Sequence, residues 1–347
     1  TFNKLSALYA FDVVTGSEKW RYVPPTNTAS YNMLTVNPVT GDIYYGTQTP
    51  GHFYAVTSEG SLKWVFEEAG SMQSAAPAVN AAGTAVYICD KSGNTFAIDA
   101  ASGQKIWNFT AGVPGGGLLV NGSELLIGAE SNAFFVNIET GEQIAKVALG
   151  CKMSDITGFA VSSDKTLAYF GAASGYIGAV DLTTHTAKTP LLAGTTNPNT
   201  IYEPVVAPNG SIFAGSKNGS VYNVKGDLSA VNWEHVHTGK AVNNTYNYSH
   251  PCVDSENRFY ITAGQTTNTS YIFDAEGRVL DSWSYTGTTA AAQRQMGGNN
   301  YLDGVFYSAF IGNGDQNGMF VGKYVGGERA SSWSTHGGDI CGSCCVK

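Results

Sequence analysis

The chain has 347 residues, of which 43% are hydrophobic and only 13% are charged, so it can bury a large core and is not expected to be disordered. Its 19 Lys and Arg residues and 27 Asp and Glu residues give a formal net charge of −8, without any basic run. Nucleic-acid binding needs a concentrated basic surface, and bilayer spans need long apolar runs, so neither a nucleic-acid partner nor a transmembrane segment is expected.

The composition indicates a protein made of short strands, and the start of the chain indicates a piece of a longer precursor. Forty-two Gly, 11 Pro and 19 Tyr residues suit many strands joined by tight turns. The chain begins at Thr1, without an initiator Met and inside a strand-like segment. We therefore expect a piece of a longer, exported precursor. The missing N-terminus of such a precursor could carry a lipid anchor.

The first predicted element is YAFDVVTGSEKW at residues 9–20, which reads as a strand, a tight turn and a second strand. Further copies follow as YAVTSEGSLKW (54–64), FAIDAASGQKIW (96–107), FVNIETGEQIA (135–145), GAVDLTTHTAK (178–188), YNVKGDLSAVNW (222–233), YIFDAEGRVLDSW (271–283) and FVGKYVGGERASSW (320–333). Trp20, Trp64 and Trp107 are 44 and 43 residues apart, and Trp233 follows after three further periods of 42. A fixed period of this length predicts a repeat architecture of the propeller kind.

Each full repeat has room for four strands. In residues 74–109 the predicted strands are SAAPAVN, TAVYICD, NTFAIDA and QKIWNFT, separated by small or polar turn residues. Four antiparallel strands make one propeller blade. We therefore predict an all-β protein, a single β-propeller domain over residues 1–347 with a Cys-rich closing tail at 334–347. Eight motif copies predict eight blades, and seven complete blades with a stray hairpin is the alternative.

The repeated motif has a structural explanation. Asp12 and Thr15 can hydrogen-bond the turn backbone, and Gly16 supplies the positive φ that a tight turn needs. Trp20 is large enough to fill the wedge between neighbouring blades. We expect the same structural docking role for four tryptophans: Trp20, Trp64, Trp107 and Trp233.

The pattern Ala-x-Asp-x-x-Thr-Gly-x-x-x-Trp at 10–20, with Ser for Thr at 97–107, resembles the tryptophan-docking repeat of the PQQ-like (quinoprotein-type, BamB-like) β-propellers. The resemblance covers nearly the whole chain and implies the fold. It implies less about function, because the family includes calcium-dependent quinoprotein dehydrogenases as well as assembly lipoproteins and cell-surface binding proteins. The chain departs from the pattern at Ala145 and Lys188, which replace the tryptophan, and at the displaced Trp283.

A binding site is expected where the chain enters each inner strand. In a propeller, the loops that join the fourth strand of one blade to the first strand of the next lie on the same face as the turns between second and third strands. Glu203 and His250 precede Pro204 and Pro251 at a position that holds the small Ala76 in another repeat. We expect this face to form the mouth of the central channel that the inner strands line. The candidate binding residues at this mouth are Tyr31, Gln73, Asp155, Tyr202, Glu203, Tyr246, Tyr248, His250 and Arg294. Their tyrosines can stack on sugars, although tyrosines that only cap the blade tops are the structural alternative.

Three functions fit these residues. Because no catalytic motif stands out, we favour a non-catalytic binding or scaffold propeller for a glycan or a protein partner, without a cofactor. We expect it to act outside the cytoplasm, in the periplasm or at a bacterial cell surface. The alternative is a quinoprotein dehydrogenase that uses PQQ and calcium, for which Asp155 is the candidate mouth-side base. A third is a hydrolase or lyase in which Glu203 works with His250 or Arg294.

The cysteines are unevenly distributed. Cys341, Cys344 and Cys345 crowd the last seven residues, and a disulfide that fixes the tail is expected in an exported protein. One short cluster lacks the paired spacing of a zinc site, so no metal site is predicted.

Overall fold

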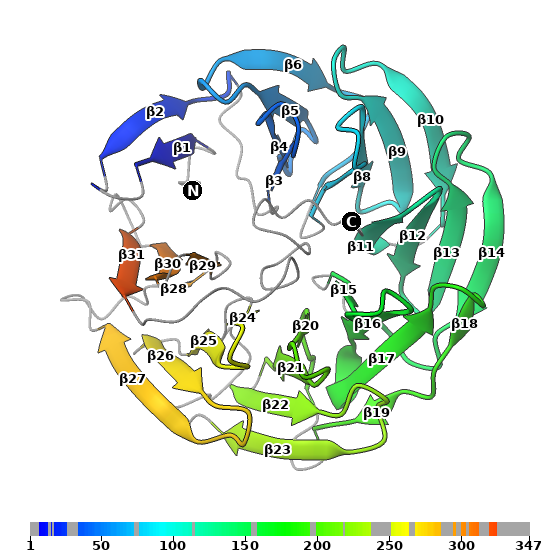
Figure 1. Ribbon diagram of the computed structural model, residues 1–347. Helices are drawn as coiled ribbons and strands as arrows, with labels where there is room; N and C mark the ends of the chain where they lie inside the picture. The colour runs from blue at the N-terminus through cyan, green and yellow to red at the C-terminus, as the bar shows by residue number, and fades with distance from the viewer. Residues whose placement is uncertain are drawn as a thin grey trace. The chain divides into compact units, whose positions relative to one another are not determined.

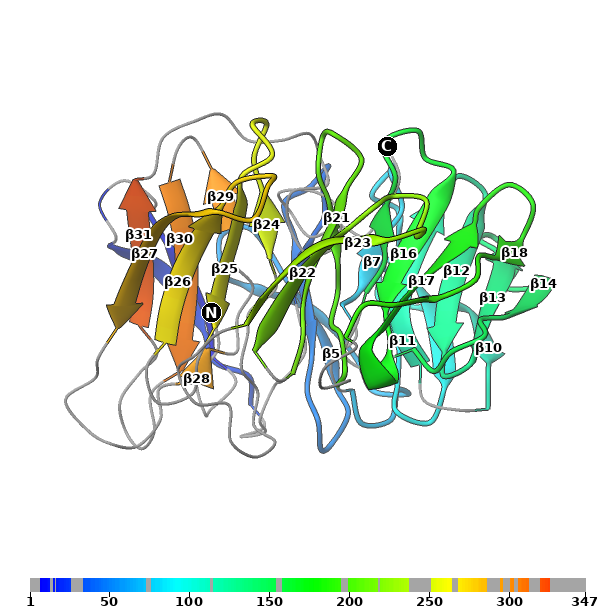
Figure 2. The ribbon, with the colours of Figure 1, turned by 90° about the horizontal axis from the view of Figure 1, so that it is seen from below.

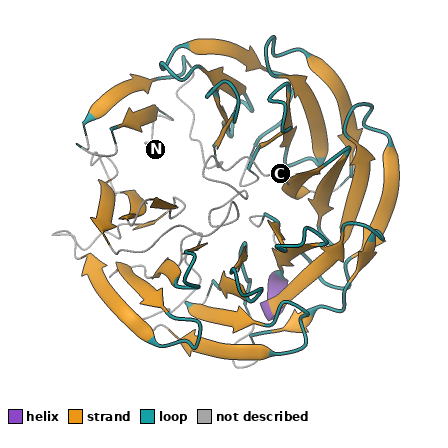
Figure 3. Cartoon of the chain, viewed as in Figure 1, coloured by secondary structure: helices purple, strands orange, loops and turns teal. Residues whose placement is uncertain are grey.

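The computed structural model describes residues 7–12, 15, 17–25, 34–72, 76–112, 115–153, 158–194, 199–217, 219–236, 251–263, 268–285, 294–295, 300–302, 305–311 and 319–324. These residues fall into two compact units, one up to Lys146 and the other from Val147 onward. Strands, turns and loops make up the described chain, together with one short 3-10 turn at Ala173–Gly175 and no α-helix (Figure 3).

The first unit is built of antiparallel sheets whose strands follow each other in chain order (Figure 1). The first sheet has two strands, β1 (Leu8–Phe11) and β2 (Glu18–Tyr22). The next has β3 (Thr35–Val36), β4 (Ile43–Gly46), β5 (Phe53–Val56) and β6 (Leu62–Phe66). The third has β7 (Ala78–Val79), β8 (Ala85–Cys89), β9 (Asn94–Asp99) and β10 (Lys105–Thr110). The fourth has β11 (Gly115–Asn121), β12 (Glu124–Ala129), β13 (Asn132–Asn137) and β14 (Gln143–Ala148), which crosses the unit boundary.

The second unit repeats this plan in its first three sheets, and its last sheet has a different strand order (Figure 2). Its first sheet has β15 (Ala160–Val161), β16 (Leu167–Gly171), β17 (Tyr176–Asp181) and a divided outer strand, β18 (Thr186–Ala187) and β19 (Leu191–Leu192), both halves of which pair with β17. The next has β20 (Val205–Val206), β21 (Ile212–Gly215), β22 (Ser220–Val224) and β23 (Val231–Val236). Then come β24 (Cys252–Val253), β25 (Phe259–Ala263), β26 (Asn268–Phe273) and β27 (Val279–Tyr285). In the last sheet β30 (Val305–Ile311) pairs with β28 (Arg294–Gln295), β29 (Asn300–Leu302) and β31 (Met319–Tyr324).

The predicted four-strand repeat is confirmed. The strands expected in residues 74–109 are β7 to β10, in the predicted order, with an inner strand of only two residues. Seven sheets contain four or five strands, and the sheet of the first motif copy contains β1 and β2. Innermost strands of successive sheets pack together, β7 against β3 and β11 in the first unit, and β20 against β15 and β24 in the second.

The turn between the third and fourth strands follows the predicted chemistry. Asp12 Oδ1 accepts hydrogen bonds from the amide of Thr15 at 2.9 Å and from its hydroxyl at 3.1 Å. Asp99 Oδ1 accepts from the amide and the hydroxyl of Ser102, both at 2.7 Å. These bonds hold the pKa of Asp99 below its ordinary value. Gly16 lies outside the described residues, but Gly103 at the same place in its turn has a φ of +74°.

Each of the four tryptophans reaches the turn between the third and fourth strands of the following sheet. The indole nitrogen donates to a backbone carbonyl in every case: Trp20 to Ser58 (2.9 Å), Trp64 to Ala100 (3.1 Å), Trp107 to Ile138 (3.0 Å) and Trp233 to Ala275 (2.8 Å). A glycine with positive φ lies under each ring, so close that a Cβ would be 2.6–2.7 Å from an indole carbon; these are Gly60, Gly103, Gly141 and Gly277. Only glycine combines that φ with so close an approach.

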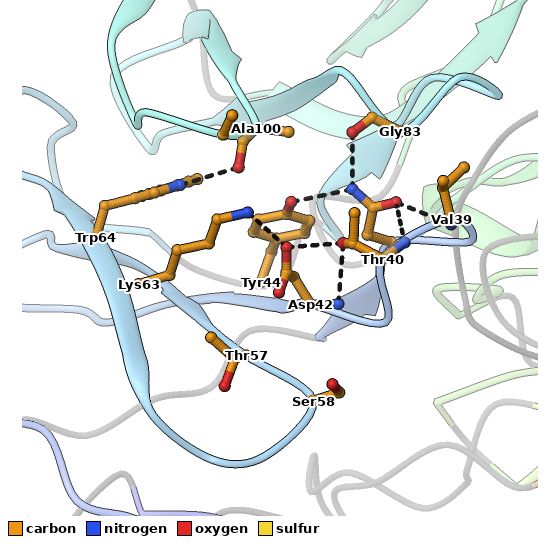
Figure 4. Close-up of polar contacts among 12 residues, drawn as sticks. Val39, Thr40, Asp42, Tyr44, Thr57, Ser58, Lys63, Trp64, Gly83 and Ala100 are labelled. Carbon is orange, nitrogen blue, oxygen red and sulfur yellow. Dashed lines mark hydrogen bonds and ion pairs between the residues drawn. The ribbon is translucent and has the colours of Figure 1, made fainter.

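Polar contacts join the sheets β3–β6 and β7–β10 beside Trp64 (Figure 4). The side-chain amide of Asn37 donates to the carbonyl of Gly83 at 2.8 Å. Nearby, Lys63 Nζ and the hydroxyl of Thr40 both lie 2.7 Å from Asp42 Oδ2, and Asp42 is only 5% exposed. The buried carboxylate is therefore both paired and hydrogen-bonded, which offsets its desolvation.

Candidate functional site

Within each unit, the segment that enters a sheet is bonded to turns between second and third strands. In the first unit, Met72 N donates to Thr47 O in the preceding sheet at 3.2 Å, and Lys91 N in the β8–β9 turn donates to Ser71 O at 2.9 Å. The entering segment is thus held by the turns on both sides of it. We call this end of a sheet the entry end.

The second unit repeats this arrangement. Ile201 N donates to Ala172 O in the preceding sheet at 3.0 Å, and Lys217 N donates to Thr200 O at 2.8 Å. The two kinds of loop lie together in each unit, as the sequence predicted. In the described parts of these two entry ends, backbone hydrogen bonds hold the entering segment to both neighbouring turns.

Glu203 lies at the entry end of the sheet β20–β23, two residues before β20, and is only 3% exposed. Its carboxylate contacts Gly158, which stands two residues before β15 in the preceding sheet. A Cβ on Gly158 would lie 2.5 Å from Glu203 Oε1 and 2.9 Å from Oε2. A large acidic side chain fits at this repeat position because the neighbouring sheet has glycine at the corresponding position.

Tyr202 is buried in the same way, also at 3% exposure. Its backbone N–H donates to Gly215 O at 3.0 Å, and its carbonyl lies so close to Gly171 that a Cβ there would be 2.1 Å away. Gly158 and Gly171 are thus the residues that bring the two sheets together at this site. Neither glycine was predicted from the sequence, although Gly158 stands at the repeat position of Ala76 and Glu203, which was a usable signal.

Two further buried carboxylates are engaged in structural contacts. Asp90 is 3% exposed, and it accepts bonds from the amides of Gly70 (3.1 Å), Ser92 (2.9 Å) and Asn94 (2.9 Å). The side-chain amide of Asn94 donates to it as well, at 2.9 Å. Its bond to Gly70 ties the entering segment to the β8–β9 turn.

Asp254 is fully buried after β24. It is bound by Arg258 Nε at 2.6 Å and by the hydroxyl of Tyr260 at 2.7 Å, and its Oδ1 accepts backbone amides. As with Asp42, the partners compensate for the burial of a charge.

The structure places only part of the predicted mouth. Tyr202 and Glu203 are adjacent and buried, and Arg294 is the first residue of β28. The other predicted site residues and the tail cysteines lie outside the described residues: Tyr31, Gln73, Asp155, Tyr246, Tyr248, His250, Cys341, Cys344 and Cys345.

Metal-binding groups and cysteine thiols were the other candidates for a functional role in this part of the chain. Among the side chains that the structure describes, no group of three or more His, Cys, Asp or Glu could hold a metal ion. Burial raises the pKa of the Cys151 thiol to about 11 and that of the Cys252 thiol well above its ordinary value. In the part of the chain that the structure describes, no helix is long and apolar enough to cross a membrane.

The repeated four-stranded meander, with successive sheets packed through their inner strands, is the building unit of β-propellers. The family model described as outer membrane protein assembly factor BamB matches residues 6–235 and 97–301. The chain therefore belongs to this PQQ-like, BamB-type repeat family.

Solved structures support the fold. The crystal structure of BamB from Moraxella catarrhalis is similar with a TM-score of 0.71 and 17% sequence identity, covering 93% of this chain and 92% of that one. The C-terminal WD40 domain of Sif2 is similar with a TM-score of 0.73 and 13% identity, over 93% and 91% of the two chains. No curated protein matches the sequence significantly. At these identities the likeness establishes the β-propeller fold alone.

Proposed function

We propose that this protein is a non-catalytic propeller that acts outside the cytoplasm and binds a protein partner at its entry ends. The observation that carries the proposal is membership of a family described by its role in outer membrane protein assembly, with a match that extends over residues 6–301. By this analogy the chain acts in the periplasm at the outer membrane, and its partner is a protein of that assembly process.

The geometry of the entry ends supports a binding role. Among the described residues, backbone hydrogen bonds join these loops at two entry ends, from Met72 to Thr47 and from Ile201 to Ala172. A preorganised surface loses little conformational entropy when it binds a partner. The buried carboxylates of Asp42, Asp90 and Asp254 are engaged in structural bonds, which favours a scaffold over acid–base chemistry.

The finer architecture is part of the proposal. We propose eight blades, of which the sheet β1–β2 belongs to the thin one, with seven blades as the alternative. The four indole contacts act as docking bonds between successive blades.

The partner interaction is tested by site-specific photo-cross-linking. A photoreactive residue replaces Lys91, which is exposed in the β8–β9 turn at the entry end, and the matched control replaces Ala82, which is exposed in the β7–β8 turn of the same sheet. In cells of the source organism, we expect a protein adduct from position 91 and none from position 82. Equal adducts at both positions, or none at either, contradict partner binding at this end.

Glycan binding is the second candidate, and it rests on the predicted mouth tyrosines Tyr31, Tyr246 and Tyr248, because Tyr202 is buried. We also propose that the chain works without PQQ or calcium. Ligands that bind only the folded state raise its thermal midpoint. A rise with a soluble polysaccharide would support glycan binding, whereas a rise with PQQ plus calcium would overturn the cofactor-free proposal in favour of a quinoprotein dehydrogenase.

A further inference from the structure

One joint between sheets in the second unit lacks the tryptophan. At the four joints with an indole, the accepting carbonyl belongs to the residue just after the one that opens the turn, such as Ala100 after Asp99. At the joint between the sheets β15–β19 and β20–β23, the tryptophan position holds Lys188. Its backbone N–H bonds the carbonyl of Ala179 in β17, the residue that corresponds to Ala97 opposite Trp107.

A tyrosine hydroxyl occupies the place of the missing indole donor. Tyr169 in β16 donates to the carbonyl of Gly226 at 2.7 Å. Gly226 directly follows Lys225, whose amide closes this turn by bonding Ala230 O, so its carbonyl corresponds to the one that an indole binds elsewhere. Burial raises the pKa of Tyr169 to about 12, so its hydroxyl remains protonated and can donate.

The first unit provides a direct comparison. Tyr87 pairs with Ala78 as Tyr169 pairs with Ala160, so the two tyrosines occupy the same repeat position. Tyr87 lies 3.4 Å from the carbonyl of Ile138, which Trp107 binds at 3.0 Å. The tyrosine bond is therefore longer at the joint that has Trp107 than at the joint that has Lys188.

The volume of the indole is also replaced. In the turn that receives Tyr169, the residue with left-handed φ is Leu228, at +59°, whereas the turns that receive an indole have glycine. Leu228 is 6% exposed and belongs to the same hydrophobic cluster as Tyr169, Ile177 and Ala179. A left-handed φ is unfavourable for leucine, yet Leu228 adopts it with its side chain buried. We interpret this as the side chain filling the space that the indole fills at the other joints.

We infer that Tyr169 and Leu228 replace the Trp–Gly pair at this joint and hold together the two sheets that carry Gly158 and Glu203. Tyr169 is a positioning residue for that contact. The inference concerns the joint alone and does not depend on what the protein binds.

The test compares Tyr169→Phe with Tyr87→Phe by hydrogen exchange and mass spectrometry. Each variant removes one tyrosine hydroxyl from the same repeat position. Tyr169 is the one side-chain donor described for the carbonyl of Gly226, whereas the carbonyl of Ile138 keeps its bond from Trp107 when the hydroxyl of Tyr87 is removed. For Tyr169→Phe we expect exchange about tenfold faster in the turn 225–230 and the entry segment 199–206, as befits the loss of one buried bond. For Tyr87→Phe we expect exchange unchanged within about twofold, because Trp107 still binds the same carbonyl.

Leu228→Ala is the second variant, because it keeps the hydroxyl bond and removes the filling side chain. We expect faster exchange in the same two segments. This variant therefore tests the inference even if Tyr169→Phe cannot be purified in folded form. Unchanged exchange in both variants overturns the inference, and so does an equal increase in Tyr169→Phe and Tyr87→Phe.

Discussion

Gly103→Ala is the most informative single change in the repeat, because it tests the contact between an indole and the turn of the next sheet. Gly103 has a φ of +74°, and a Cβ there would lie 2.7 Å from Cγ and Cδ2 of Trp64. Both atoms belong to the rigid indole, and Trp64 is only 8% exposed in a packed core. Trp64 therefore has to move away from the turn.

The expected cost has two parts. An alanine at this φ costs about 1–2 kcal/mol in backbone strain. Overpacking against the indole costs about 1–3 kcal/mol more, including the weakened bond from Trp64 to Ala100. We therefore expect Gly103→Ala to lower the free energy of unfolding by about 2–5 kcal/mol.

Gly112→Ala separates the two parts. Gly112 has nearly the same φ, +78°, but no atom of the described residues lies within 4 Å of the Cβ position, so the backbone strain remains without the clash. Urea unfolding followed by far-UV circular dichroism compares the variants through their midpoints at constant slope. If Gly103→Ala is no more destabilising than Gly112→Ala, contact with the Trp64 indole does not require glycine at this turn position, and our reasoning is wrong.

Three further predictions concern the buried groups. Gly158→Ala is expected to cost about 1–3 kcal/mol by displacing the Glu203 carboxylate, and less in a Glu203→Ala background; additive costs in a urea double-mutant cycle would contradict the contact. Arg258→Ala is expected to cost about 3 kcal/mol because its aspartate is fully buried, whereas Arg278→Ala, at an exposed pair of the same spacing, should cost less than about 1 kcal/mol, and similar shifts in the urea midpoint would refute this. Alkylation of Cys151 should rise with a midpoint near pH 11; a midpoint near the ordinary thiol value of about 8.5 would show that the thiol is not desolvated.

Much of the fold was predictable because its signals are local. The Asp and Thr of the turn hydrogen-bond to each other over only three residues, as Asp12 and Thr15 do. The turn can therefore be predicted without knowledge of a neighbouring strand. The period of the motif then fixed the order of the strands. The size of the tryptophans predicted a docking role, but the carbonyl that each indole binds belongs to another sheet and was not predictable from one motif copy.

The candidate site was less predictable. The sequence marked Glu203 as an acidic residue at a position of small residues, and it suggested a residue facing the mouth of a channel. The structure shows a side chain that is 3% exposed and lies against Gly158. Whether a side chain at such a position faces solvent or a neighbouring sheet depends on the size of a residue in the other sheet, which the local pattern does not contain.

The sequence by itself determined the class of fold, the four-stranded repeat and the chemistry of its turns, because each depends on hydrogen bonds and alternation within about a dozen residues. Only the tertiary structure decided how one sheet meets the next. At the joint without a tryptophan, Tyr169 lies on a different strand from the Lys188 that replaces the indole, and Leu228 lies in the next sheet. Donor, acceptor and filling side chain come together only when the strands have paired, so no single stretch of sequence records the exchange.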